Sequence, residues 1–176
     1  MTSLIAKPCT LIALALLCAM PALATTPANN VVGWIEDGLI QPDGIPVKVK
    51  MDTGALTSSL HAEGIERFEK NGDKWVRFTV EVKNSKTGKR VSQVFERQIE
   101  RNVKVRGAGG EERRPVVDMQ ICIGNKTYTE PFTLSDRGLM NYPVLIGRRT
   151  LAQLGLVDVS RTFTTKPTCS KETAAR

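Results

Sequence analysis

The chain contains a single histidine, His61, among its 176 residues. This scarcity excludes any metal site that needs two imidazoles, and it leaves His61 as the only histidine that could act as the base of a Ser-His-Asp triad. Aromatic residues make up only 5% of the chain, and the lysines and arginines are scattered rather than gathered into a basic stripe. Nucleic acid is therefore not an expected partner.

The sequence also lacks an apolar run of the roughly 20 residues that a membrane-spanning helix needs. Its main apolar run, Leu11–Met20, follows Lys7 and leads into the small-residue segment Pro21-Ala22-Leu23-Ala24. A short apolar stretch between a basic residue and a small-x-small site is typical of a secretory signal, although an uncleaved anchor is an alternative. We expect a signal peptide at residues 1–24, cleavage after Ala24, a periplasmic or secreted mature chain, and no stable membrane insertion after cleavage.

Two motifs of nucleotide and metal chemistry are missing. No Gly-x4-Gly-Lys-Ser/Thr loop is present to hold phosphates, and no His-Glu-x-x-His pair is present to hold zinc. The glycine-rich segment 107–110 lacks the lysine of a phosphate loop. A catalytic zinc normally takes three protein ligands, and His61 with Glu63 would supply two at most. We therefore expect neither a cofactor nor a metal.

Cysteine usage changes once the expected signal is removed. Cys9 and Cys18 leave with it, and Cys122 and Cys169 remain. In an oxidising compartment this pair can form one disulfide, and two free thiols are the alternative.

Most of the remaining sequence has the short period of strands. Segment Ile45–Met51 alternates strictly between apolar and polar residues, as does Lys74–Lys83. Further extended stretches are expected at 31–35, 91–105, 115–123, 126–134 and 144–147, with one short helix at 148–154 that ends at Gly155. The pattern predicts one all-β domain over 31–163, preceded by a polar leader at 25–30 and followed by a poorly ordered tail at 164–176.

The segment Asp52-Thr53-Gly54-Ala55 is the most informative about chemistry. It ends an alternating strand with an acid, a hydroxyl and a glycine, although an ordinary turn would have similar residues. Downstream, the apolar segment 144–146 leads through Gly147 into the expected short helix. Aspartic peptidases of the retropepsin kind pair such an Asp-Thr-Gly loop with an apolar-apolar-Gly segment.

Five segments in order carry a more specific resemblance. They are Val32-Gly-Trp-Ile-Glu36, the stretch from Lys50 to His61, Trp75-Val-Arg-Phe78, Leu134-Ser-Asp-Arg137 and Pro143-Val-Leu-Ile-Gly-Arg148. Together they resemble the bacterial retropepsin-like aspartic peptidase family, whose members are often labelled ATP-dependent zinc proteases. The resemblance implies a retropepsin-like barrel with one short C-terminal helix, and aspartic endopeptidase activity on a protein or peptide substrate. The missing phosphate and zinc motifs argue against the label.

The resemblance also implies roles for single residues. Asp52 is the expected catalytic residue, and Thr53, Gly54 and Ala55 are expected to shape its loop. Peptide hydrolysis by carboxylates uses two of them around one water, and the chain has one Asp-Thr-Gly, so we expect a homodimer. The expected supporting residues are His61, Glu36, Arg77, Arg137, Gly147 and Arg148.

Two points stay open from the sequence. The turns at 84–89 and 107–110 are both candidates for a flap over the substrate. A non-catalytic peptide-binding module of the same fold is the main alternative to an enzyme, and a zinc-dependent peptidase is a weaker one.

Overall fold

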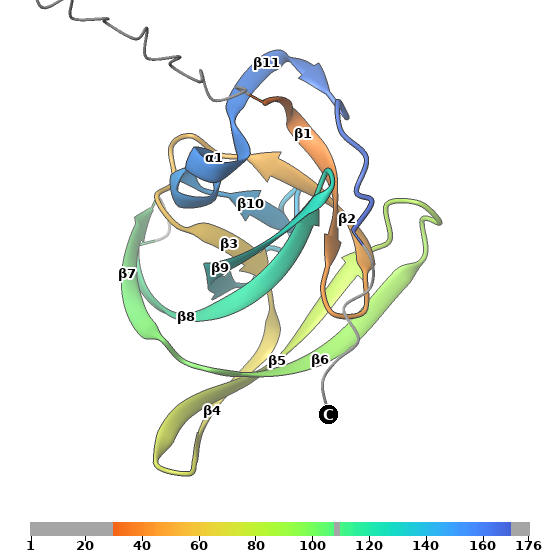
Figure 1. Cartoon of the computed structure of the whole chain (residues 1–176). Helices are drawn as coiled ribbons and strands as arrows, with labels where there is room; N and C mark the ends of the chain where they lie inside the picture. Colours follow the sequence, from red (N-terminus) through yellow and green to blue (C-terminus); the bar gives the residue numbers. More distant parts are fainter. Residues whose placement is uncertain (1–29, 108–109, 170–176) are drawn as a thin grey trace, which may run out of the picture.

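The computed structural model describes residues 30–107 and 110–169. The expected signal peptide and residues 25–29 of the expected leader lie outside the described residues. The described part contains eleven strands and one helix (Figure 1). No helix within it has the length and apolar character needed to cross a membrane. The elements are β1 (Val31–Ile40), β2 (Ile45–Met51), β3 (Ser58–His61), β4 (Glu63–Lys70), β5 (Asp73–Lys83), β6 (Arg90–Gln98), β7 (Arg101–Gly107), β8 (Gly110–Ile123), β9 (Lys126–Ser135), β10 (Val144–Ile146), α1 (Arg148–Leu154) and β11 (Leu156–Thr162).

Eight strands form one sheet in the order β11-β1-β2-β10-β3-β9-β8-β7. A further pairing of β1 with β8, in which Leu39 faces Cys122, closes six of these strands into a ring. Within the ring β10 lies between β2 and β3, parallel to β2 and antiparallel to β3. The expected retropepsin-like all-β fold, with a single short helix, is confirmed.

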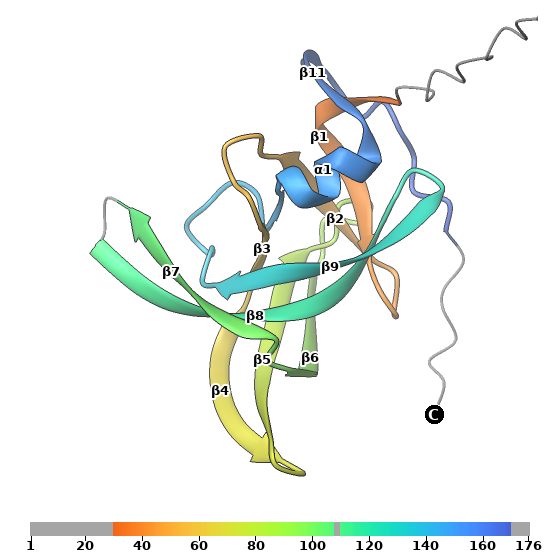
Figure 2. The same ribbon diagram turned by 60° about the vertical axis from the view of Figure 1, so that its left-hand side comes forward.

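A second sheet interrupts this arrangement between β3 and β7. Strands β4, β5 and β6 form it, and its β4–β5 end projects away from the eight-stranded sheet in both views (Figures 1 and 2). The sequence predicted one extended stretch over 91–105, which is wrong in one respect. The extended stretch is interrupted between Gln98 and Arg101 and forms two strands, and β6 and β7 belong to different sheets.

The alternating pattern of β2 places its residues as predicted. Val47, Val49 and Met51 are buried in the core, whereas Lys48 and Lys50 lie on the opposite face, which is more open to solvent. Burying an aliphatic side chain of this size contributes roughly 1.5–3 kcal/mol. The apolar positions therefore fix the register of β2, and with it the place where the strand ends at Asp52.

The segment after β11 is a strap that runs back across β1. Phe163 N–H donates to Ile35 O at 2.8 Å, and Cys169 forms a disulfide with Cys122 of β8. Between these points the fully buried Glu36 carboxylate accepts five hydrogen bonds of 2.5–3.1 Å from Gly33 N–H and from the N–H and hydroxyl groups of Thr164 and Thr165. The expectation of a poorly ordered tail is therefore wrong for 164–169, and 170–176 lie outside the described residues.

Glu36 has an acid-sensitive role in this strap. Burial alone would raise the pKa of its carboxyl group, but the hydrogen bonds from Thr164, Thr165 and Gly33 outweigh burial and hold the pKa below the ordinary 4.5. The pKa is thus lower in the folded chain than in the unfolded one. The resulting stabilisation is fully present above the unfolded value and is lost as the pH falls through the folded value.

We expect Glu36→Gln to lower the free energy of unfolding at neutral pH by about 2–3 kcal/mol, because an amide cannot accept all five hydrogen bonds. The variant should also lose less stability than the unmodified chain on acidification below pH 4.5. Urea unfolding at several pH values measures both effects. Asp37→Asn is the matched control, because the neighbouring Asp37 carboxylate accepts no hydrogen bond from the described residues. Equal losses in the two variants would contradict the role of the strap.

Candidate active site

Asp52 directly follows β2, where β2 pairs in parallel with β10. Met51 faces Ile146 across this pair, and Asp52 N–H donates to Ile146 O at 2.8 Å. Gly147 and α1 follow β10 at once. The Asp-Thr-Gly loop and the apolar-apolar-Gly segment, far apart in the sequence, therefore lie side by side, and α1 covers the loop end of the ring (Figure 1).

The loop holds the Asp52 side chain in one orientation. Its Oδ1 accepts the N–H of Gly54 at 3.0 Å and the N–H of Ala55 at 3.2 Å. Oδ2 has no hydrogen-bond partner within 30–107 or 110–169. One carboxylate oxygen is thus fixed by the backbone, while the other is available to a water molecule or to a second carboxylate.

Arg148 attaches this loop to the start of α1. Its Nη1 donates to the carbonyl oxygens of Thr53 and Gly54, both at 2.9 Å, and its backbone N–H donates to Ala55 O at 2.9 Å. The guanidinium group therefore holds the loop through carbonyl groups and makes no ion pair with Asp52. Arg148, one of the expected supporting residues, thus contacts the Asp52 loop directly.

Buried hydroxyl groups connect the segment after the Asp52 loop with Gly147 and α1. Ser58 Oγ accepts the N–H of Gly147 at 3.0 Å and lies 3.1 Å from Thr150 Oγ1. The Thr133 hydroxyl donates to Ser58 O at 3.1 Å. Sequence reasoning missed Ser58 and Thr150. The run of polar residues directly after the Asp-Thr-Gly loop could have pointed to Ser58, whereas Thr150 lies in α1 and has no such signal.

Arg137 is a buried arginine that lines two cavities. Burial lowers the pKa of its guanidinium group, as does the positive charge of Arg114, while the negative charge of Asp52 acts in the opposite direction. Arg137 lines a cavity of about 840 Å³ and a second of about 500 Å³, which both also reach Met140 and Asn141. Asp52 lines neither cavity, but Lys50, two residues before it in the chain, lines the smaller one.

The larger cavity lies between the β4–β6 sheet and the closed ring. The flap candidate at 84–89 contributes Asn84, Ser85 and Gly88 to its lining. The other candidate, 107–110, includes residues outside the described part. Three cations of the cavity, Lys48, Lys83 and Arg137, make no ion pair with any carboxylate of the described residues. The cavity can therefore accommodate an anionic group.

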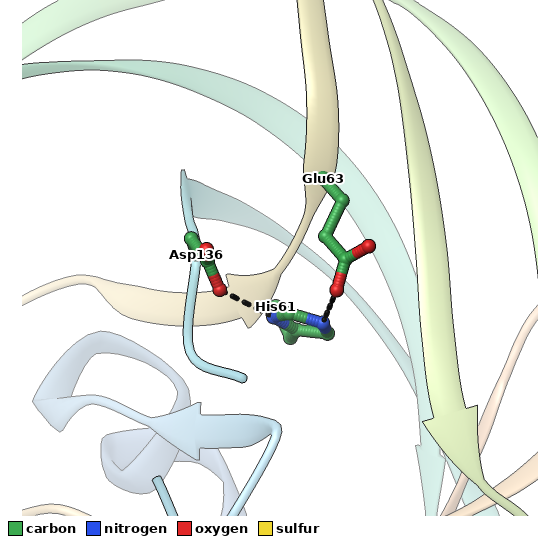
Figure 3. A group of neighbouring side chains, drawn as sticks. All are labelled: His61, Glu63 and Asp136. Carbon is green, nitrogen blue, oxygen red and sulfur yellow. Dashed lines mark hydrogen bonds and ion pairs between the residues drawn. The ribbon is translucent and has the colours of Figure 1, made fainter. Parts of the chain in front are cut away.

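One group of residues with metal-ligand chemistry lies beside this cavity: His61 and the two acids that flank it. Glu63 Oε1 lies 3.0 Å from its Nε2, and Asp136 Oδ1 lies 3.7 Å from its Nδ1. Figure 3 shows the acids on opposite sides of the imidazole ring. Nδ1 also accepts the N–H of Arg137 at 2.9 Å, so its lone pair is occupied. Only Nε2 and Glu63 are left for an ion, and two protein ligands do not fit a catalytic zinc site.

Two of the expected supporting residues lie away from the site. Glu36 anchors the C-terminal strap rather than forming an ion pair. Arg77 lies on β5 of the second sheet and pairs with Glu96, at 2.7 Å, and with Glu66, at 3.8 Å. Asp52, Thr53, Gly54, Ala55, Gly147 and Arg148 are brought together around the loop, and His61 and Arg137 lie beside the cavity.

Comparisons with known proteins agree with this geometry. Residues 31–168 match the model of the RimB-like family, described as "Retropepsin-like aspartic endopeptidase RimB". A crystal structure of a protein of unknown function from Legionella pneumophila is 36% identical, with a TM-score of 0.67, and the match covers 79% of this chain and 100% of that one.

Curated relatives carry a different name. The chain is 33% identical over 123 residues to a "Probable alpha-L-glutamate ligase" from Shewanella pealeana, and 32% identical over 133 residues to one from Desulfotalea psychrophila. These matches cover 68% and 74% of this chain but only 26% and 28% of the relatives, so the chain spans about a quarter of their length. None of these names mentions zinc or ATP dependence. From the match over 31–168, together with the fold and the Asp-Thr-Gly loop, the chain belongs to the RimB-like family of retropepsin-like aspartic endopeptidases.

Proposed function

We propose that the chain is an aspartic endopeptidase that acts as a homodimer, with Asp52 of each copy facing a shared water molecule. The observation that carries this proposal is the Asp52 carboxylate, whose Oδ1 is fixed by Gly54 and Ala55 while Oδ2 remains open. A carboxylate held in this way by its own loop suits a reaction in which a proton must be taken from a positioned water.

The chemistry explains why two copies are needed. Two carboxylates about 3 Å apart cannot both ionise readily, so they share one proton. The ionised member removes a proton from the water as the water oxygen attacks the scissile carbonyl carbon, and the protonated member donates its proton to the carbonyl oxygen. The tetrahedral intermediate then collapses: the C–N bond breaks, a proton passes to the leaving amine, and a carboxylic acid and an amine result.

We further propose that the substrate is an acidic peptide. The chain carries a formal net charge of +7, and Lys48, Lys83 and Arg137 line the larger cavity without carboxylate partners among the described residues. The curated relatives, which contain a segment similar to this chain, carry the name "Probable alpha-L-glutamate ligase". A peptide rich in alpha-linked glutamate would complement the charge of the cavity.

We also propose that the enzyme works in the periplasm or outside the cell. The expected signal at 1–24 and the Cys122–Cys169 disulfide both support an oxidising compartment.

Subunit mixing tests the shared site. Unmodified chains are refolded together with Asp52→Asn chains, and cleavage of a glutamate-rich peptide is measured as the unmodified fraction falls. If each site needs Asp52 from two copies, activity follows the square of that fraction, so an equal mixture retains about one quarter of the activity. A linear decrease would contradict the homodimeric site. Mixing with Asp118→Asn, an exposed acid on β8, should leave activity unchanged.

A further inference from the structure

The unusual feature beside the site is a buried imidazole that is bonded on both edges. His61 ends β3 and is only 4% exposed. Its Nδ1 lies 2.9 Å from the backbone nitrogen of Arg137, and its Nε2 lies 3.0 Å from Glu63 Oε1. A buried ring that uses both nitrogens has a fixed orientation, since any rotation would break one of the two bonds.

These contacts determine the protonation of the ring. A backbone N–H can only donate, so Nδ1 must accept from Arg137 with its lone pair. Nε2 then carries the hydrogen and donates it to the Glu63 carboxylate, and Figure 3 marks this contact with a dashed line. The ring is neutral in this arrangement, and both nitrogens are satisfied. A second proton on Nδ1 would remove the acceptor of the Arg137 N–H.

Arg137 is held at three points. Its N–H donates to His61, its carbonyl oxygen accepts the N–H of Met140 at 2.8 Å, and its Nε donates to Tyr142 O at 3.1 Å. Tyr142 is in turn packed edge-on against Trp34 of β1. Arg137 as a whole residue is only 8% exposed, and no carboxylate of the described residues pairs with it. A largely buried arginine that lines two cavities calls for an anionic partner.

We propose that His61 is a positioning residue: its neutral imidazole holds the backbone of Arg137 so that the guanidinium group can bind a carboxylate of the substrate in the cavities that Arg137 lines. The inference rests on the proposed acidic substrate, and it adds the residue that presents the anion-binding group. Arg137 suits this task because its planar group can bind a carboxylate through two parallel hydrogen bonds. His61 acts through Arg137, because both of its ring nitrogens are already bonded, one to Arg137 and the other to Glu63.

Two variants of His61 separate its two bonds. In His61→Asn the side-chain oxygen can replace Nδ1 as the acceptor for Arg137 N–H, whereas in His61→Gln the longer amide reaches the Nε2 position near Glu63 instead. Both are tested in chains that also carry Asp52→Asn, which removes turnover. Calorimetry then measures the binding of a glutamate peptide, with a glutamine peptide of the same length as the neutral probe.

We expect His61→Gln to weaken binding of the glutamate peptide about tenfold and His61→Asn to change it less than threefold, because His61→Gln leaves the Arg137 N–H without an acceptor and no longer fixes the backbone of Arg137. Glu63→Gln is the matched control on the other side of the ring; it keeps an acceptor for Nε2 and should not weaken binding. Arg137→Lys should weaken the glutamate peptide and leave the glutamine peptide unchanged.

Three results would overturn the proposal: equal losses in His61→Asn and His61→Gln, equal losses for the two peptides, or no binding of the glutamate peptide to the His61-containing chain. Thermal unfolding of each variant shows whether a loss reflects folding. If both His61 variants unfold, unchanged binding of the glutamate peptide in Arg137→Lys would still overturn the proposal, because Arg137 would then not be the group that binds the carboxylate. The proposed function can fail separately. If the peptide binds in a His61-dependent way but the unmodified chain never cleaves it, the peptidase assignment is wrong and the positioning role stands.

Discussion

Replacing Asp52 with asparagine is expected to lower the rate of peptide cleavage at least about 10³-fold, because the amide can neither take a proton from the water nor share one with its partner. The fold should survive. An asparagine oxygen can still accept the N–H groups of Gly54 and Ala55, which now reach Oδ1 at 3.0 and 3.2 Å. The measurement is kcat/KM on a glutamate-rich peptide, together with a thermal unfolding curve.

Asp118→Asn makes the same chemical change at an exposed position of β8, outside the loop, and should leave kcat/KM unchanged. The comparison also separates the enzyme from a peptide-binding module of the same fold. A binding module would retain its affinity in Asp52→Asn and would show no cleavage before the substitution. If Asp52→Asn cleaves as fast as the unmodified chain, Asp52 is not the catalytic residue.

The local part of the site was predictable, because it is encoded in contiguous residues. Strict alternation placed β2 over Ile45–Met51 and its end at Asp52. The helix was expected at 148–154, directly after Gly147, and α1 has those bounds. Strands β3, β4 and β11 were missed because their sequences do not alternate: β3 is buried throughout, whereas β4 and β11 are largely exposed.

The rest of the site depends on contacts between distant segments. A motif position does not show which element a side chain faces, so Glu36 and Arg77 were grouped with the site although one holds the strap and the other pairs with Glu96. The bond between His61 and Arg137 links residues 76 positions apart. It exists only because β3 pairs in parallel with β9, which places His61 beside Ser135. No local pattern reports such a pairing.

The second large effect is expected from Gly147→Ala. A Cβ atom at this position would lie 2.7 Å from the carbonyl carbon of Thr57 and 2.9 Å from Leu56 O. The backbone of Gly147 is extended, with φ −84° and ψ 173°, so close approach rather than dihedral strain requires glycine here. The atoms in the way belong to the backbone and cannot rotate aside. Relieving such a clash costs about 1–3 kcal/mol in unfolding free energy.

The shift of the backbone that relieves this clash should also lower the catalytic rate, because residues 56–57 continue the Asp52 loop. Leu56 O accepts the N–H of Arg149, and Gly147 N–H is bonded to Ser58 Oγ, so a displaced Gly147 moves the loop relative to α1. A misplacement of about 1 Å can lower a rate about 10²-fold, and we expect kcat to fall by about that factor at temperatures where the variant is folded.

Gly33→Ala separates the effect on the loop from the effect on stability. A Cβ atom there would lie 2.6 Å from Arg161 O of β11, a clash as severe as that at Gly147 but with β11 instead of residues 56–57. The Gly33 variant should therefore lose stability while each folded molecule keeps its activity. If both variants lose activity in proportion to the folded fraction, Gly147 supports folding alone. If only Gly147→Ala lowers kcat in the folded state, the close contact between Gly147 and residues 56–57 is what holds Asp52 in its reactive position.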